Sequence, residues 1–216
     1  MTARTIAVVS AGLSTPSASR LLADRLYQAT ERKLESVSVP ASPVVVELRD
    51  HARDITNALL THVPSASLAA ALSAVADADG LIAVTPVFNG SYSGLFKMFF
   101  DALDPDSMAA LAGKPVLAAA AGNSPRHSLV IEHAIRPMFG YLHSVVVPTG
   151  VYASAEDWGA STDSDSGSGG ADALDERIAR AAGELADLIA ARPPAASRPA
   201  DDPYQGFTPF EKLLKG

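Results

Sequence analysis

The chain contains no cysteine, and this absence removes several kinds of chemistry. Without a thiol it can form no disulfide, no thiolate metal site and no cysteine nucleophile. The first residues, Met-Thr-Ala-Arg-Thr-Ile, lead directly into strand-like sequence and contain no apolar signal-peptide region. We therefore expect a cytoplasmic protein.

Long apolar runs and basic residues are also scarce. No apolar run reaches about 18 residues, the length that suggests a membrane-spanning helix, so we expect no membrane span. The formal net charge is -7, from 17 basic and 24 acidic residues. This balance argues against general binding to the phosphate backbone of nucleic acids.

What the chain does have is a regular alternation of short apolar runs and helical patterns. Its 216 residues, 48% of them hydrophobic, can bury one substantial core. Five runs have the composition of buried strands, and they span residues 5–10, 44–48, 80–85, 116–121 and 144–147. Apolar residues at helical spacing predict helices from Ser17 or Ser19 to about Lys33, from Asp50 to about Ala76, after Ser93, from Pro125 or Arg126, and from about Asp172 to Ala191.

Strands separated by helices imply a parallel sheet covered on both faces, because parallel pairing needs crossover helices. We predict an α/β, flavodoxin-like, doubly wound sheet of five parallel strands in the order 2-1-3-4-5, with the switch point between the first and third strands. Residues 1–191 would form this domain. An acidic, Gly/Ser-rich stretch at 153–170 is expected to be a mobile loop, and the tail at 192–216 is expected to dock on its own domain or on a second subunit.

Three strand ends converge on one edge of such a sheet. The first, Ser10-Ala-Gly-Leu-Ser-Thr-Pro-Ser-Ala-Ser19, is rich in hydroxyls and leads into a helix amino terminus. Free amides, the helix dipole and hydroxyl donors together suit a phosphate group. The alternative is an ordinary loop with Ser17 as the helix cap. The segment is neither a Walker A sequence nor Gly-x-Gly-x-x-Gly, which disfavours a nucleoside triphosphate or a standard dinucleotide fold.

The second strand end is Pro86-Val-Phe-Asn-Gly-Ser91. Pro86 is expected to stop the strand, and Asn89-Gly90 tolerates positive φ, so the chain turns here. Such a turn can lay its backbone against a flat heterocycle, while Phe88 supplies apolar contact. A plain strand-to-helix turn without a ligand is the alternative.

The third strand end is Ala121-Gly-Asn-Ser-Pro-Arg-His127. Gly122 allows close approach of the backbone, and Asn123 and His127 bring polar side chains to the same edge. His127 either contacts a substrate or caps its own helix, and the sequence leaves both open.

Other catalytic sites find little support. There is no Gly-x-Ser-x-Gly nucleophile elbow, which argues against a hydrolase. We expect no metal site, because the remaining histidines lack paired ligand spacing with carboxylates; they are His51, His62, His133 and His143.

Taken together, these three segments resemble the NAD(P)H-dependent FMN reductase family, and most closely its actinobacterial-type branch. The resemblance covers about residues 5–152, and the tail sequence Pro-Phe-Glu-Lys-Leu-Leu is similar to that branch too. It implies that the first loop holds the flavin phosphate and that the second and third flank the isoalloxazine ring. The residues that inherit these roles are Ser10, Ser14, Ser17 and Ser19 for the phosphate, Pro86, Val87, Phe88, Asn89 and Gly90 for one side of the ring, and Gly122 and Asn123 for the other.

The chain departs from the family pattern at three places. Many relatives carry an arginine in the phosphate loop, but residues 11–18 contain none, so neutral donors would hold the phosphate and FMN would be retained less tightly. Phe88 stands where relatives often have tyrosine. Ala121-Gly122-Asn123 replaces a common Thr-Gly-Gly, which changes the third loop's contacts with the ring.

The resemblance also implies an activity. NADPH or NADH would transfer hydride to N5 of FMN when the two rings stack, so the protein would supply orientation and electrostatics, and we assign no catalytic acid or base. Reduced FMN would serve a flavin-dependent monooxygenase, or the protein would act as a quinone or azo reductase. A flavodoxin-like electron carrier is the non-enzymatic alternative. Relatives are commonly dimers or tetramers, so a homo-oligomer is expected.

Overall fold

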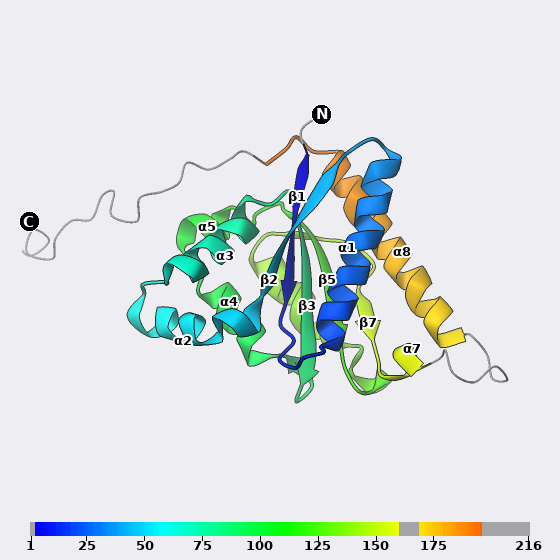
Figure 1. The fold of residues 1–216 in the computed structure, drawn as a ribbon, viewed down its shortest axis with the longest axis horizontal. Helices are drawn as coiled ribbons and strands as arrows, with labels where there is room; N and C mark the ends of the chain where they lie inside the picture. Colours follow the sequence, from blue (N-terminus) through cyan, green and yellow to red (C-terminus); the bar gives the residue numbers. More distant parts are fainter. Residues whose placement is uncertain (1–2, 160–168, 196–216) are drawn as a thin grey trace, which may run out of the picture.

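A twisted sheet forms the centre of the structure, a computed structural model that describes residues 3–159 and 169–195 (Figure 1). The five parallel positions run in the order β2-β1-β3-β5-β6, with β4 and β7 added beside β3 and β5. The strands are β1 (Arg4–Ser10), β2 (Ala41–Glu47), β3 (Gly80–Phe88), β4 (Ser91–Tyr92), β5 (Pro115–Ala121), β6 (Val145–Val146) and β7 (Val151–Ala153). The predicted fold class and the order of the five parallel strands are confirmed, but the described residues form a sheet of seven strands and not five.

The two extra strands have separate causes. β4 forms a short antiparallel hairpin with the end of β3, pairing Val87 with Tyr92. The expected fifth strand is broken between β6 and β7: β6 pairs with the start of β5 and β7 with its end. Pro148 and Gly150 lie in this break, where neither residue favours a continuous strand.

Helices cover both faces of the sheet. They are α1 (Ala18–Ser36), η1 (Leu48–His51), α2 (Ala52–Thr61), α3 (Ala66–Asp77), α4 (Gly94–Asp101), α5 (Pro105–Ala109), η2 (Pro125–His127), η3 (Ile131–Ile135), α6 (Arg136–Tyr141), α7 (Glu156–Gly159) and α8 (Gly169–Ala190). Figure 1 shows α1 and α8 side by side on one face and α2 to α5 on the other. The last helix predicted from the sequence is α8, and it starts at Gly169, slightly before the expected Asp172.

Alternation along the strands divides the core into two layers. On β1, Ile6 and Val8 pack toward α1 and α8, whereas Ala7 and Val9 pack toward the opposite helices. On that second side α4 contributes Phe96, which contacts Phe100 and Phe139 edge to face. Burial of these apolar side chains, each worth about 1.5–3 kcal/mol, holds the helices on the sheet.

Serine side chains cap the starts of two helices, and the sequence indicated both positions. Ser17 Oγ accepts a hydrogen bond from the Arg20 amide at the start of α1, at 3.3 Å. Ser93 does the same for the Phe96 amide of α4, at 3.2 Å. Both serines occupy the N-cap position, where a hydroxyl satisfies an otherwise unpaired amide. These caps place both helix amino termini at the carboxyl edge of the sheet.

The prediction of a loop at residues 153–170 is wrong at both ends of that range. Ala153 is the buried last residue of β7, and α7 forms at Glu156–Gly159, where Asp157 accepts hydrogen bonds from Ser154 and Arg177. Helix α8 already begins at Gly169. The remaining residues, 160–168, lie outside the described part of the chain.

The last described residues are fastened at the amino edge of the sheet. Arg4 bridges to Asp79 at 3.0 Å with both side chains nearly buried, and it also donates to the Arg192 carbonyl. The Ala195 amide donates to Asp79 Oδ1 at 2.7 Å. Residues 196–216, which carry most of the tail prediction, lie outside the described residues.

Within residues 3–159 and 169–195, no single helix is long and apolar enough to cross a membrane, although the bent pair 48–61 and 66–77 meets the length and composition test.

Candidate functional site

The first strand end is a tightly packed loop between β1 and α1. Ser10 is fully buried at the end of β1, and its hydroxyl is one of two buried side-chain atoms without a hydrogen-bond partner among the described residues. A Cβ built on Gly12 would lie 1.9 Å from Ser17 Oγ, so only glycine fits here. Ser14 Oγ donates to the Pro16 carbonyl at 2.9 Å, and Ser19 is buried at the start of α1. The four predicted serines thus lie around one loop at a helix amino terminus.

The second strand end is a hairpin and not a simple stop. Pro86 was expected to end the strand, but β3 continues to Phe88 and turns at Asn89 (φ 50°) and Gly90 (φ 81°). The proline is tolerated because β1 pairs with β3 only as far as Ser10 beside Val84, so among the described strands none needs a hydrogen bond from residue 86 on that side. Two successive residues with positive φ form the tight turn that two-residue hairpins prefer.

The hairpin leaves an open surface at the edge of the sheet. Phe88 is 45% exposed, and Asn89 and Gly90 are exposed beside it. Behind the turn, Thr85 Oγ1 accepts the Ser93 amide at 3.0 Å, which fixes the hairpin to the start of α4. An exposed aromatic side chain on a fixed turn is suited to contact with a flat ligand.

The third strand end is fastened by β7. The Gly122 amide donates to the Ala153 carbonyl at 2.9 Å, so this amide is engaged within the protein. A Cβ on Gly122 would lie 2.3 Å from Tyr152 Oη, and this hydroxyl donates to the Ser124 carbonyl at 2.7 Å. Burial, with the negative charge of Asp157, raises the pKa of Tyr152 above its usual value. Asn123 is exposed next to this fixed turn.

The helix predicted to start at Pro125 or Arg126 is a single 3₁₀ turn instead, and the continuous helical segment starts at Ile131. His127 lies in the 3₁₀ turn with its side chain exposed, and its amide donates to the Ser124 carbonyl at 3.2 Å. Among the described residues no group of three or more His, Asp or Glu side chains is placed to hold a metal ion.

Strand register brings the three ends to one edge of the sheet. The Ala11 amide donates to the Val84 carbonyl at 2.9 Å, two residues before Pro86, and Pro86 pairs with Ala121. The first loop, the hairpin and the third loop are therefore neighbours in that order along the carboxyl edge. A cavity of about 450 Å³ adjoins the third loop, and Pro125, Ser128, Tyr152 and Arg177 are among its lining residues.

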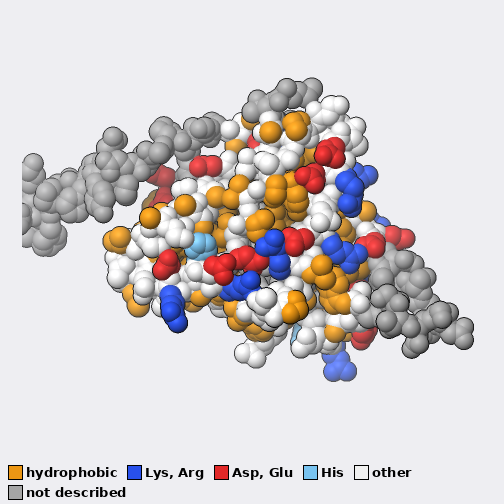
Figure 2. Space-filling view, viewed as in Figure 1, with side chains coloured by type: hydrophobic (Ala, Val, Ile, Leu, Met, Phe, Trp, Pro, Cys, Tyr) orange, Lys and Arg blue, Asp and Glu red, His pale blue; other side chains and the backbone are white. Residues whose placement is uncertain are grey.

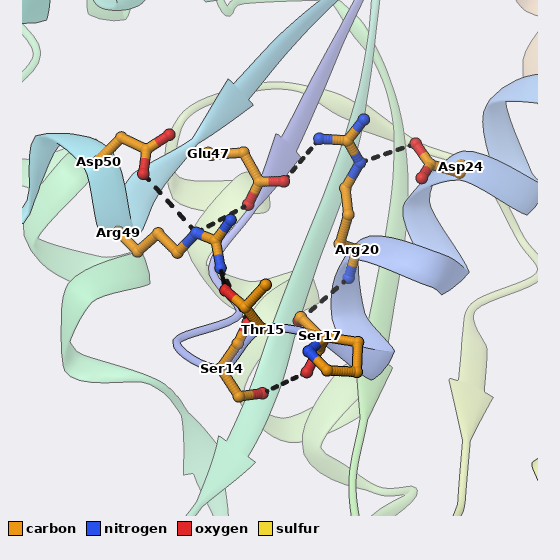
Figure 3. Close-up of polar contacts among 9 residues, drawn as sticks. Ser14, Thr15, Ser17, Arg20, Asp24, Glu47, Arg49 and Asp50 are labelled. Carbon is orange, nitrogen blue, oxygen red and sulfur yellow. Dashed lines mark hydrogen bonds and ion pairs between the residues drawn. The ribbon is translucent and has the colours of Figure 1, made fainter.

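Two functional candidates were missed in the sequence. Figure 3 shows Arg49, from η1 after β2, reaching the first loop, where it contacts Ser14 and Thr15. Tyr152 was not assigned to any element. The sequence did contain one signal for Arg49: it directly follows the second strand. The carboxyl end of that strand lies at the same edge of the sheet as the other three strand ends.

The chemistry of these groups fits a phosphorylated flat ligand such as FMN. A buried hydroxyl without a partner, a glycine that leaves no room for a side chain and the first amides of α1 surround the loop that would take the phosphate. The exposed turn at Phe88 to Gly90 offers a flat surface one strand away. Hydroxyl and amide donors at a helix amino terminus suit binding and orientation of a phosphorylated cofactor.

Comparison with known proteins points in the same direction. A family described as NADPH-dependent FMN reductase matches residues 4–159. The chain is 40% identical over 153 residues to an NADH-dependent FMN reductase from Pseudomonas fluorescens and 37% identical over 153 residues to an FMN reductase (NADPH) from Pseudomonas aeruginosa, covering 71% of this chain and 78% of each relative. A solved oxidoreductase from Corynebacterium diphtheriae superposes with a TM-score of 0.81 at 45% identity, covering 88% of this chain and 99% of the other.

Proposed function

Since the chain belongs to the NADPH-dependent FMN reductase family, we propose that the three strand ends on one edge of its sheet form a single FMN site. The family resemblance drawn from the sequence is confirmed, and with it FMN as the flavin and NADPH or NADH as the hydride donor. The protein is an NAD(P)H-dependent flavin oxidoreductase. The assignment of individual residues to the site is our proposal.

The first loop is assigned to the phosphate. The observation that carries this assignment is the buried Ser10 hydroxyl, which has no protein partner among the described residues and lies at the start of a glycine-containing loop. A phosphate oxygen would satisfy it. The amides at the amino terminus of α1 and the hydroxyls of Ser17 and Ser19 are the further donors, and Ser14 would join them by exchanging its hydrogen bond to the Pro16 carbonyl for one to the phosphate.

The hairpin and the third loop are assigned to the isoalloxazine ring. Pro86, Val87, Phe88, Asn89 and Gly90 present an exposed edge whose geometry is fixed by the positive φ values and by the link between Thr85 and Ser93. On the other side β7 holds Gly122, and Tyr152 holds Ser124, the residue after Asn123. Because these turns are already held in place, they can orient a flat ring without a further loss of conformational entropy when it binds.

Bound FMN supplies the redox chemistry, because its ring accepts a hydride from reduced nicotinamide. The protein holds the ring at an exposed edge, so that a second flat ring can reach it. No side chain of the described residues is assigned as a catalytic acid or base. His127, exposed at the same edge, is a candidate to contact the incoming nicotinamide nucleotide.

The activity is tested by mixing the purified protein with FMN and either NADPH or NADH and following the absorbance of the reduced nicotinamide. We expect oxidation that requires both the protein and FMN. Flavin binding without nicotinamide oxidation would instead support the flavodoxin-like electron carrier.

The fate of the reduced flavin is a further proposal. The hairpin turn supports release of reduced FMN to a flavin-dependent monooxygenase, because Phe88, Asn89 and Gly90, which would contact the ring, are exposed. Gel filtration of the protein loaded with FMN tests this. Colour that separates from the protein supports release, and colour that stays supports onward transfer to a quinone or azo compound.

We also propose a homodimer or homotetramer in the cytoplasm, the compartment in which reduced nicotinamides are available. Large apolar side chains are exposed on or next to the three strand-end segments: Leu13 is 54%, Phe88 45% and Leu129 59% exposed. A second copy would cover them. Light scattering and cell fractionation test the two parts separately.

A further inference from the structure

The loop assigned to the phosphate has no positive side chain of its own. Residues 11–18 contain neither lysine nor arginine, and the whole chain carries a formal net charge of -7. A phosphate monoester carries between one and two negative charges at neutral pH. Binding of this phosphate to a protein of net negative charge therefore calls for a positively charged side chain near the loop.

Two arginines lie beside the loop, and one of them donates short hydrogen bonds to two carboxylates. Arg20 Nε is 2.8 Å from Asp24 Oδ1, and Arg20 Nη1 is 2.5 Å from Glu47 Oε1. The hydrogen bond that Arg20 donates to Glu47 is the largest of the effects that raise the pKa of Arg20. This guanidinium is neutralised by its two partners.

Arg49 is held differently. Its Nη1 donates to the Ser14 carbonyl at 3.0 Å and to the Thr15 hydroxyl, so the guanidinium is anchored on the loop itself (Figure 3). Its carboxylate neighbours are farther away: Nε is 3.6 Å from Asp50 Oδ1 and 3.9 Å from Glu47 Oε2. These separations exceed the length of a hydrogen bond to an ionised group.

The same side chain keeps donors available. About a third of the Arg49 side chain is exposed, and within the described part of the chain Nη2 has no hydrogen-bond partner. A guanidinium has five donors in a fork that matches phosphate oxygens. On the face seen in Figure 2, Lys and Arg side chains lie scattered among Asp and Glu side chains, so no broad basic patch could replace it.

We propose that Arg49 supplies the positive charge that attracts the FMN phosphate, and that it does so from the turn after β2 while holding Ser14 and Thr15 in place. This inference rests on the proposed FMN site. It changes the expectation from the sequence that only neutral donors would hold the phosphate. It also makes Arg49 specific for phosphorylated flavin, since riboflavin lacks the charged group.

The test compares FMN with riboflavin in calorimetric titrations of the full chain. Arg49→Met should weaken FMN binding roughly 10-fold, the size of one hydrogen bond to a charged group, and leave riboflavin binding unchanged. Arg49→Lys should recover part of the loss, because it keeps the charge without the fork. Arg32→Met, which removes the same charge from an exposed position near the far end of α1, is the matched control and should bind FMN as the wild type does.

A second variant should gain affinity, which misfolding cannot explain. Asp50→Asn removes the exposed carboxylate nearest Arg49 Nε and should tighten FMN binding about two-fold. Added salt should weaken FMN binding by the wild type more than by Arg49→Met.

Equal losses for FMN and riboflavin in Arg49→Met, or unchanged FMN binding, would overturn the role of Arg49 and leave the FMN site standing. A wild-type protein that binds neither flavin would overturn both.

Discussion

Gly12 is the position in the first loop with the least room for a side chain. A Cβ there would lie 1.9 Å from Ser17 Oγ and 2.9 Å from Ser17 Cβ, so Gly12→Ala must displace the residue that caps α1. Loss of that cap costs about 1 kcal/mol, and FMN affinity should fall with it. Gly140→Ala, in α6 with open space around it, is the control and should leave FMN affinity unchanged. Thermal melts and FMN titrations measure both effects, and full FMN affinity in Gly12→Ala would contradict the assignment of the loop.

Tyr152 links the third loop to β7 through one hydroxyl. Tyr152→Phe removes the 2.7 Å hydrogen bond to the Ser124 carbonyl and should lower the free energy of unfolding by about 1 kcal/mol.

The hydroxyl also gives a pH dependence. Because burial raises the pKa of Tyr152 above 10.0, the folded state keeps this proton more tightly than the unfolded state does. Its contribution to stability is complete below pH 10.0 and is lost as the pH rises through the folded value. Denaturant unfolding from pH 8 to 11, a range that brackets the ordinary tyrosine pKa of about 10, should therefore show a shallower alkaline decline in Tyr152→Phe than in the wild type. Identical profiles would show that the phenol is not buried as described.

At the scale of elements, the hairpin of β3 and β4 carries the ring contacts. Gly90→Val puts a β-branched residue at φ 81°, which costs about 1–2 kcal/mol locally, and it should weaken FMN binding while the fold is retained. Gly113→Val is a close match, because Gly113 also has positive φ (72°) and open space but lies at the opposite edge of the sheet. Similar melting temperatures with FMN affinity reduced only in Gly90→Val are expected. Equal FMN affinity in the two variants would remove the hairpin from the site.

The elements also show how far the sequence could predict this fold. Strands rich in valine, isoleucine and alanine that alternate with amphipathic helices predicted a parallel sheet covered on both faces, and Ser17 and Ser93 marked two helix starts. The strand order came from choosing the flavodoxin-like arrangement, because periodicity does not determine it. The sequence did not reveal that Pro86 continues β3, because its tolerance depends on where β1 stops pairing. The three residues of β7 form too short a run to be recognised alone.

The candidate site was predicted to a similar extent. Loops that follow directly after strands were found, since all of them fall on the carboxyl edge of a parallel sheet. Arg49 and Tyr152 were not found, because their contacts join residues 34 and 28 positions apart in the chain. Such pairs depend on the register of the folded sheet, which no local pattern reports.

At the scale of the whole molecule, the tail remains a prediction. We propose that residues 196–216 dock on their own domain at the amino edge, since Arg192 and Ala195 are already fastened there. An apolar groove lined by Met108, Tyr141 and Leu142 shares Ala112 with the surface under Pro193 and Pro194, so it is within reach.

Replacing both Phe207 and Phe210 by serine should expose this groove. Binding of a hydrophobic dye should increase, while FMN binding at the opposite edge should not change. Dye binding equal to that of the wild type would reject docking on the same chain, and a change in subunit number by light scattering would assign the tail to a second subunit.

The central claim is that three strand ends form one FMN site, and amide chemical shifts measured during an FMN titration test it most directly. The account predicts that the amides of Gly12, Gly90 and Asn123 shift together, with one common saturation curve, while Gly113 at the opposite edge stays unchanged. Shifts confined to the groove at Met108 and Tyr141, or no shifts at any FMN concentration, would contradict it.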